Sequence, residues 1–146
     1  MANNFTRRLS DNFALRAEHD IRNVHGAPGW IELTTGDPVR AGEFFAAAFG
    51  WNVKPMQIGG GDYWVISVKG HDVGGMRRPM PGMPDKPFWA SYITVEDVDA
   101  AAERALHAGG KICVPVTELP GAGKLVGFEH PQGGQMMAFE YVQAFQ

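Results

Sequence analysis

Apolar and polar positions follow the same order twice along the chain. Residues 30–34 and residues 91–95 alternate between apolar and polar side chains, the pattern of a strand that buries one face. After each alternating segment, apolar residues recur at helical spacing. In the first stretch these are Ala41, Phe44, Phe45, Ala48 and Phe49, and in the second Val98, Ala101, Ala102, Ala105 and Leu106. The pattern predicts a strand followed by an amphipathic helix, and it does so twice.

Both expected helices carry start and stop signals. Asp37 and Asp97 stand where an N-cap is needed, because a carboxylate there accepts hydrogen bonds from free backbone N–H groups. Pro38 suits the first helical position. Gly50 ends the first helix and Gly109-Gly110 the second, since glycine adopts the left-handed conformation of a helix C-terminus. We therefore expect helices over about 38–49 and 98–108.

Three short extended segments follow each helix. They are separated by glycine-rich turns typical of β-hairpins. The expected strands are 51–58, 63–69 and 72–77 in the first half, and 111–117, 124–129 and 135–142 in the second. An offset of 60 residues without a gap superimposes the two halves. The sequence therefore predicts an α+β domain over 29–143, built from two tandem βαβββ modules (29–79 and 88–143) joined by a linker at 80–87.

Residues 1–28 lie outside the repeat. Phe5, Leu9 and Phe13 are spaced by four residues, so part of this segment is expected to form an amphipathic helix. Two interpretations remain open. The segment is either an extension packed on its own domain, or an N-terminal arm that reaches across a dimer partner.

Composition narrows the class of protein. The 146 residues include 19 glycines, well above the usual share of about 7%. The net charge is −3 and no basic stripe is present, which argues against nucleic acid as a partner. No apolar run reaches the roughly 18 residues of a membrane span, and residues 1–25 lack the apolar core of a signal peptide. Cys113 is the only cysteine, so a cytoplasmic location and a buried, inert thiol are expected.

Four stretches give the modules a family resemblance. They are Gly29-Trp30-Ile31-Glu32-Leu33, Phe44-Phe45 through Phe49-Gly50-Trp51, residues 95–101 (Val-Glu-Asp-Val-Asp-Ala-Ala), and His130-Pro131-Gln132-Gly133-Gly134. With the βαβββ repeat they resemble the vicinal oxygen chelate (VOC) superfamily, which includes glyoxalase I, extradiol dioxygenases, and bleomycin and fosfomycin resistance proteins. The similarity is greatest to a glyoxalase-related bacterial subgroup and covers about residues 26–143. It implies a curved, cup-like mixed sheet with the helices outside, a small-molecule ligand and a homodimer.

Strand parity then assigns side chains to the inside of the cup. Ile31 and Leu33 are expected to face the helix, which turns Trp30, Glu32 and Thr34 inward. The same reasoning turns Ala90, Tyr92 and Thr94 inward on the matching strand.

The resemblance also implies where metal ligands would stand. Counting from the helix caps and turns of such proteins, the four positions hold Trp30, Arg77, Ala90 and Met137. Indole, guanidinium, methyl and thioether groups do not suit a metal that prefers oxygen or nitrogen ligands. The five histidines (His19, His25, His71, His107 and His130) share no spacing that would bring them together. We therefore expect no metal and no cofactor.

Without a metal, the expected ligand-binding residues form an aromatic, partly polar lining. They are Trp30, Glu32, Thr34, Arg77, Tyr92, Met137 and Phe139, with Trp64, Phe88 and Trp89 at the rim. Apolar walls with a few polar groups suit a planar or amphipathic small molecule. Glu32 is the candidate catalytic residue, as a general base with Arg77 binding an anionic oxygen. The two could equally form a buried structural ion pair.

Three functions follow from these residues and stay open. The first is a binding protein with a metal-free cup. The second is a lyase or isomerase of glyoxalase type, which would use either a metal or Glu32 as base. The third is a non-catalytic assembly partner that uses its N-terminal arm.

Overall fold

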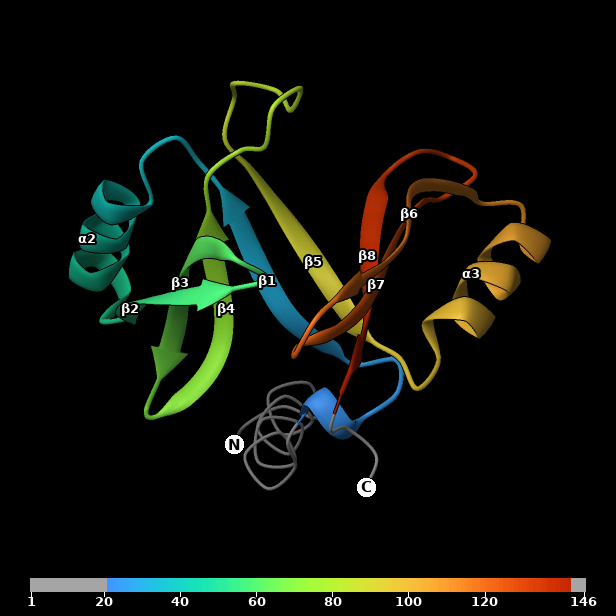
Figure 1. The fold of residues 1–146 in the computed structure, drawn as a ribbon, viewed down its shortest axis with the longest axis horizontal. Coiled ribbons are helices and arrows are strands. Elements are labelled where there is room, and N and C mark those ends of the chain that lie inside the picture. Colours follow the sequence, from blue (N-terminus) through green and yellow to red (C-terminus); the bar gives the residue numbers. More distant parts are fainter. Residues whose placement is uncertain (1–20, 143–146) are drawn as a thin grey trace, which may run out of the picture.

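The computed structural model describes residues 21–142 (Figure 1). The N-terminal arm expected over residues 1–28 lies mostly outside this range. In chain order the elements are η1 (Ile21–Asn23), β1 (Pro28–Thr34), α2 (Pro38–Phe49), β2 (Asn52–Ile58), β3 (Gly61–Val68), β4 (His71–Arg77), β5 (Phe88–Thr94), α3 (Val98–His107), β6 (Lys111–Leu119), β7 (Gly123–Glu129) and β8 (Gln135–Tyr141). These elements confirm the predicted repeat of strand, helix and three strands.

One mixed sheet contains all eight strands, in the order β2-β3-β4-β1-β5-β8-β7-β6. The modules meet where β1 and β5 pair in antiparallel fashion at the centre of the sheet. Within each module the first and last strands pair in parallel, β1 with β4 and β5 with β8. Figure 1 shows α2 and α3 at opposite ends of the sheet with β1 and β5 between them. This arrangement confirms the α+β fold of two tandem modules.

The helix ends form as the sequence predicts. Asp37 Oδ1 accepts a 3.0 Å hydrogen bond from the backbone N–H of Arg40. Asp97 Oδ1 accepts one of the same length from the N–H of Ala100. Gly50 then closes α2 in the left-handed conformation, with φ of 71°.

Two apolar clusters attach the helices to one face of the sheet. Under α2, Leu33, Ile66 and Met76 form a buried cluster against which Ala41 and Phe45 pack. Under α3, the cluster consists of Val95, Val98, Val126 and Ala138. Leu33 and Val95 thus face the helices, as strand parity predicts.

The apolar stripe of α2 is buried only in part. Phe44 and Phe49 are 64% and 63% exposed. The helix approaches the sheet mainly through Pro38 and Gly42, which are buried. A Cβ at position 42 would lie 3.3 Å from Val53, so glycine permits this close approach.

The two modules differ in register toward their ends. β6 contains irregularities between Ile112 and Val114 and between Val114 and Thr117, whereas β2 pairs with β3 without a shift. The pairing shows that the offset between the modules grows by two residues from β1 and β5 to β4 and β8. The gap-free repeat made Arg77 the counterpart of Met137, and this is wrong. Gly75 lies opposite Glu32 as Met137 lies opposite Tyr92, so Gly75 is the counterpart of Met137.

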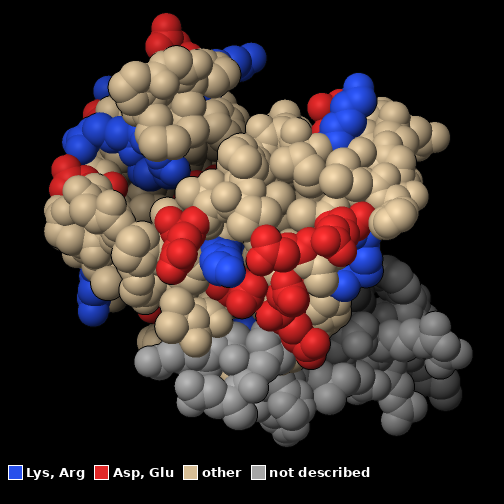
Figure 2. All heavy atoms as spheres, turned by 45° about the vertical axis from the view of Figure 1, so that its right-hand side comes forward, with Lys and Arg blue, Asp and Glu red and all other residues tan. Residues whose placement is uncertain are grey.

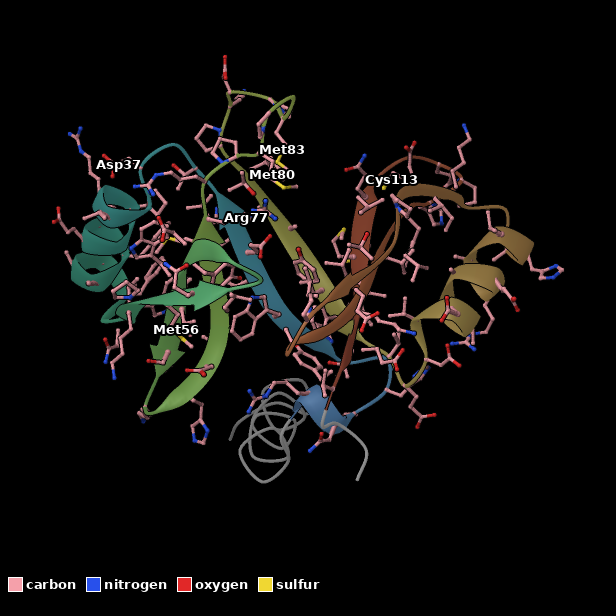
Figure 3. All side chains as sticks on the ribbon, viewed as in Figure 1. Asp37, Met56, Arg77, Met80, Met83 and Cys113 are labelled. Atoms are coloured by element: carbon pink, nitrogen blue, oxygen red, sulfur yellow. The ribbon has the colours of Figure 1, made fainter. Side chains whose placement is uncertain are left out.

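The same irregular strand explains a second correction. Cys113 was expected to be buried, but it is exposed on β6 (Figure 3). β6 is an edge strand of the sheet, and Cys113 lies between the two paired residues Ile112 and Val114, where the register shifts. A residue at such a point is not held toward the core.

Acidic side chains are concentrated on one face of the molecule (Figure 2). In Figure 2, with the α3 side turned forward, acidic side chains gather on the visible face. Asp99 in the first turn of α3 is paired with Lys124 at 3.6 Å, and both side chains are well exposed. No helix in residues 21–142 is long and apolar enough to cross a membrane.

Candidate functional site

A cavity of about 200 Å³ opens on the sheet face opposite the helices. Leu33 and Val95 face the helices, so their neighbours along β1 and β5 point to this second face. Both modules contribute to the lining. The described lining consists of Arg22, Trp30, Glu32, Ile58, Tyr63, Tyr92, Leu119, Ala122, Phe139 and Tyr141.

Glu32 is the centre of a hydrogen-bonded chain in this cavity. The Tyr63 hydroxyl donates to Glu32 Oε2 at 2.8 Å, and the Tyr92 hydroxyl donates to Oε1 at 3.0 Å. Trp30 Nε1–H in turn donates to the Tyr63 oxygen at 2.9 Å. Each carboxylate oxygen therefore has a phenol donor, and the Tyr63 hydroxyl both donates and accepts.

The two phenols are held in their neutral form. Burial raises the pKa of Tyr63 far above its usual value of 10.0, and the nearby negative charge of Glu32 raises it further. The pKa of Tyr92 is raised by the same two causes, burial first, while the guanidinium of Arg77 acts in the opposite direction. A phenolate beside a carboxylate would repel it, so both tyrosines remain hydrogen-bond donors.

Gly75 gives Tyr63 the room to reach Glu32. In the strand order β3-β4-β1, position 75 on β4 lies between Tyr63 and Glu32, directly opposite Glu32. A Cβ at position 75 would overlap the ring and hydroxyl of Tyr63. The ring therefore lies across the bare backbone of β4, and a larger residue there would close the path.

The structure brings four of the seven expected ligand-binding residues into the cavity lining. Trp30, Glu32, Tyr92 and Phe139 line it together. Thr34, Arg77 and Met137 share that face of the sheet but lie outside the described lining. Met137 lies instead over the bare backbone of Gly127, which Val114 also approaches.

Glu32 and Arg77 do not pair as the sequence suggested. Within residues 21–142, no ion pair shorter than 4.0 Å joins them. Arg77 Nε donates to the backbone oxygen of Arg78 at 3.4 Å (Figure 3). Glu32 accepts its hydrogen bonds from the two phenols instead, so the structure does not contain the ion pair that the sequence left open.

Sequence reasoning missed Tyr63, which links Trp30 to Glu32. On β3 both alternating faces are apolar or aromatic, so the pattern cannot tell which one enters the cup. Trp64 was expected at the rim, but it packs in the cluster under α2. Trp89, also expected at the rim, lies on the helix side of the sheet, with its ring centroid 5.6 Å from that of Phe45.

The residues present do not fit the metal of VOC enzymes. Trp30, at one expected position, offers an indole N–H that already donates to Tyr63. Ala90 and Met137 provide a methyl group and a soft thioether. With the register corrected, the position opposite Glu32 holds Gly75, which has no side chain. No group of three or more His, Cys, Asp or Glu side chains in the described part of the chain could hold a metal ion.

Comparisons with known proteins agree on the class of protein that this fold defines. The family model described as the Glyoxalase/Bleomycin resistance protein/Dioxygenase superfamily matches residues 27–137. The chain therefore belongs to this superfamily, and the resemblance seen in the sequence is confirmed.

The similar proteins with curated names are bacterial. The chain is 33% identical over 112 residues to "Putative glyoxylase CFP32" of Mycobacterium tuberculosis, a match covering 74% of this chain and 43% of that protein. It is 27% identical over 126 residues to "Anthracycline biosynthesis protein DnrV" of Streptomyces peucetius, covering 77% and 46%. The chain thus spans less than half the length of either relative.

Solved structures with the same fold include methylmalonyl-CoA epimerases. The Mycobacterium tuberculosis enzyme matches with a TM-score of 0.57 and 14% identity, covering 79% of this chain and 87% of that one. A Streptomyces coelicolor epimerase in complex with 2-nitronate-propionyl-CoA matches with a TM-score of 0.60 and 13% identity, covering 82% and 97%. At these identities the likeness shows the fold alone.

Proposed function

We propose that the protein binds a small aromatic or amphipathic organic molecule in the cavity around Glu32, without a metal. The observation that carries this proposal is the chain of hydrogen bonds from Trp30 through Tyr63 to Glu32, inside an open cavity. Ligand sites combine apolar walls with a few fixed polar groups that set orientation. Here aromatic rings and aliphatic side chains form the walls, and a carboxylate held by two phenols is the fixed polar group.

The relatives support small-molecule chemistry at this site. One is named for anthracycline biosynthesis and another as a glyoxylase, and both names concern small organic compounds. The site also resembles a preformed pocket, because the hydrogen bonds hold Glu32 in place before any ligand arrives. Preorganisation of this kind lowers the ordering cost of binding.

The indole N–H of Trp30 gives a direct test. In a ¹⁵N NMR spectrum the chain shows one indole signal for each of its four tryptophans, and the Trp30→Phe variant identifies the signal of Trp30. A library of single-ring fragments should contain compounds that shift this signal. Trp89 faces the helix side of the sheet, so its signal is the internal control. Fragments that shift only the Trp89 signal, or no fragment that shifts the Trp30 signal, would contradict the proposal.

Proton transfer is the second candidate, because the cavity holds a carboxylate next to the ligand space. Glu32 already accepts a hydrogen bond at both oxygens, which favours binding over catalysis in the free protein. The two functions separate in D₂O. A catalyst would exchange an acidic C–H proton of a bound fragment, and the Glu32→Gln variant would stop that exchange. A binding protein would show no exchange above that of buffer.

We also propose that the protein forms a homodimer and lies in the cytoplasm. Assembly through the N-terminal arm is the third proposed role. Sedimentation of the full chain and of a chain lacking residues 1–20 tests both points. A dimer that becomes a monomer on truncation would support the arm, whereas an unchanged mass would assign it no role in assembly.

A further inference from the structure

We infer that the cavity selects an organic cation, an alkylammonium or quaternary ammonium group, with Glu32 as its counter-ion. This inference rests on the proposed function and names the class of ligand. It is carried by two independent features of the described lining: a set of aromatic rings and a single carboxylate among them.

Aromatic side chains make up half of the described lining of the cavity. Five of the ten described lining residues are aromatic: Trp30, Tyr63, Tyr92, Phe139 and Tyr141. Two pairs of these rings are inclined rather than stacked. Tyr92 and Phe139 meet at 69° with centroids 6.2 Å apart, and Phe139 and Tyr141 meet at 51° with centroids 4.6 Å apart. The π-face of an aromatic ring attracts a cation without strong hydration.

Glu32 is a partly buried carboxylate without an ion-pair partner in residues 21–142. Its two hydrogen-bond donors are phenols, and both are neutral. An ionised carboxylate in a partly apolar cavity costs free energy until a positive charge approaches. A cationic ligand would place a positive charge beside the carboxylate, whereas a neutral aromatic ligand would not.

The size of the cavity sets a limit on the ligand group. A cavity of about 150 Å³ holds benzene, so this cavity of about 200 Å³ takes one ring or one trimethylammonium group with a short chain. Arg22 is the positively charged residue in the described lining, and it would oppose a cation. The inference therefore requires that the five rings and Glu32 outweigh Arg22.

Three water-soluble probes test the inference. Choline and 3,3-dimethylbutan-1-ol have the same shape but differ in charge, and benzyl alcohol is a neutral ring. Titrations follow the Trp30 indole signal at constant ionic strength. A desolvated cation–π contact should make choline bind roughly 30-fold more tightly than its neutral counterpart.

The other outcomes of these titrations distinguish failure of the cation inference from failure of the proposed function. Equal or tighter binding of a neutral probe would overturn the cation inference and leave the proposed function in place. No effect of any probe on the Trp30 signal would contradict both. Binding of choline that shifts only the other tryptophans would place the cation site elsewhere and overturn the inference as well.

Variants separate the two parts of the site. Glu32→Gln should remove most of the preference for choline over 3,3-dimethylbutan-1-ol, and a preference that persists in this variant would overturn the role of Glu32 as counter-ion. Glu43→Gln is the matched control, because Glu43 is exposed on α2, outside the described lining. If Glu32→Gln fails to fold, Phe139→Leu removes one ring and keeps every charge. It should weaken choline binding more than binding of the neutral isostere, and equal weakening would overturn the aromatic contribution.

Discussion

The Tyr92 hydroxyl donates a 3.0 Å hydrogen bond to Glu32, and the two residues hold the same position in the two modules. They lie on the central strands β5 and β1, on the same face of the sheet, and 60 residues apart. The duplication thus places a donor and an acceptor next to each other at the joint of the sheet. The site exists because the two copies differ at this position.

Loss of the Tyr63 hydroxyl should destabilise the fold more than loss of the Tyr92 hydroxyl. Tyr92→Phe removes one donor to a carboxylate, which costs about 1.5–3 kcal/mol. Tyr63→Phe removes a donor to Glu32 and also the acceptor for Trp30 Nε1–H. Urea unfolding of both variants measures the difference, and an equal loss of unfolding free energy would mean that the Trp30 hydrogen bond contributes nothing.

Gly75→Ala should displace the Tyr63 ring. The added methyl group overlaps that ring, and such overpacking costs roughly 1–3 kcal/mol. Adding Tyr63→Ala should relieve the overlap, so that the double variant loses less than the two single losses together. Gly36→Ala is the control, since a Cβ there meets no atom within 4 Å. Additive losses in the double variant would rule out contact between the two positions.

Stability should fall at alkaline pH. The pKa values of Tyr63 and Tyr92 are raised in the folded protein, so the neutral phenols stabilise it. This stabilisation is complete below the unfolded pKa of about 10 and is lost as pH rises above it. Unfolding free energies between about pH 8 and about pH 11 should fall less steeply for the variant with both tyrosines changed to Phe. Identical slopes would show that these phenols do not contribute.

Arg22→Gln should strengthen cation binding. Arg22 places a positive charge in the lining, and its removal lowers the repulsion felt by choline. We expect a several-fold gain in choline affinity relative to that of 3,3-dimethylbutan-1-ol, measured by the Trp30 titration. Thermal unfolding of the variant checks that the fold is retained, because Arg22 has other contacts. Weaker choline binding in a stable variant would contradict the proposed placement of charge.

Chelators should change neither stability nor ligand binding. The described side chains at the expected metal positions are poor ligands, and Trp30 is already engaged with Tyr63. Treatment with EDTA, followed by elemental analysis and thermal unfolding, tests this. Stoichiometric nickel, zinc or iron whose removal lowers the melting temperature would revive metal-dependent chemistry.

Much of the fold could be predicted because its signals are local. Asp37 and Asp97 cap their helices through contacts within four residues, and alternation on β1 fixes which face meets the core. The register of β8 could not be predicted, because the bulges of β6 depend on pairing across the sheet. Because of that error, Arg77 instead of Gly75 was assigned as the counterpart of Met137.

The site was predicted only where strand parity was clear. Trp30, Glu32 and Tyr92 lie on strands with one face against a helix, so their inward direction followed from the sequence. Tyr63 lies on a strand with large side chains on both faces, and its role depends on the absence of a side chain at Gly75. The contact depends on the lack of a side chain at position 75, and no periodic pattern in the sequence indicates it.

The difference between Gly75 and Met137 also concerns how the two modules diverged. One module has no side chain where the other has a methionine, so the two modules no longer contribute equivalent groups to the cavity. The first supplies Trp30, Glu32 and Tyr63 to the cavity, and the second supplies Tyr92, Phe139 and Tyr141. Changes in one half can then alter ligand preference while the other preserves the frame. Divergence between the copies, rather than their likeness, is what selection could act on to give related proteins different ligands.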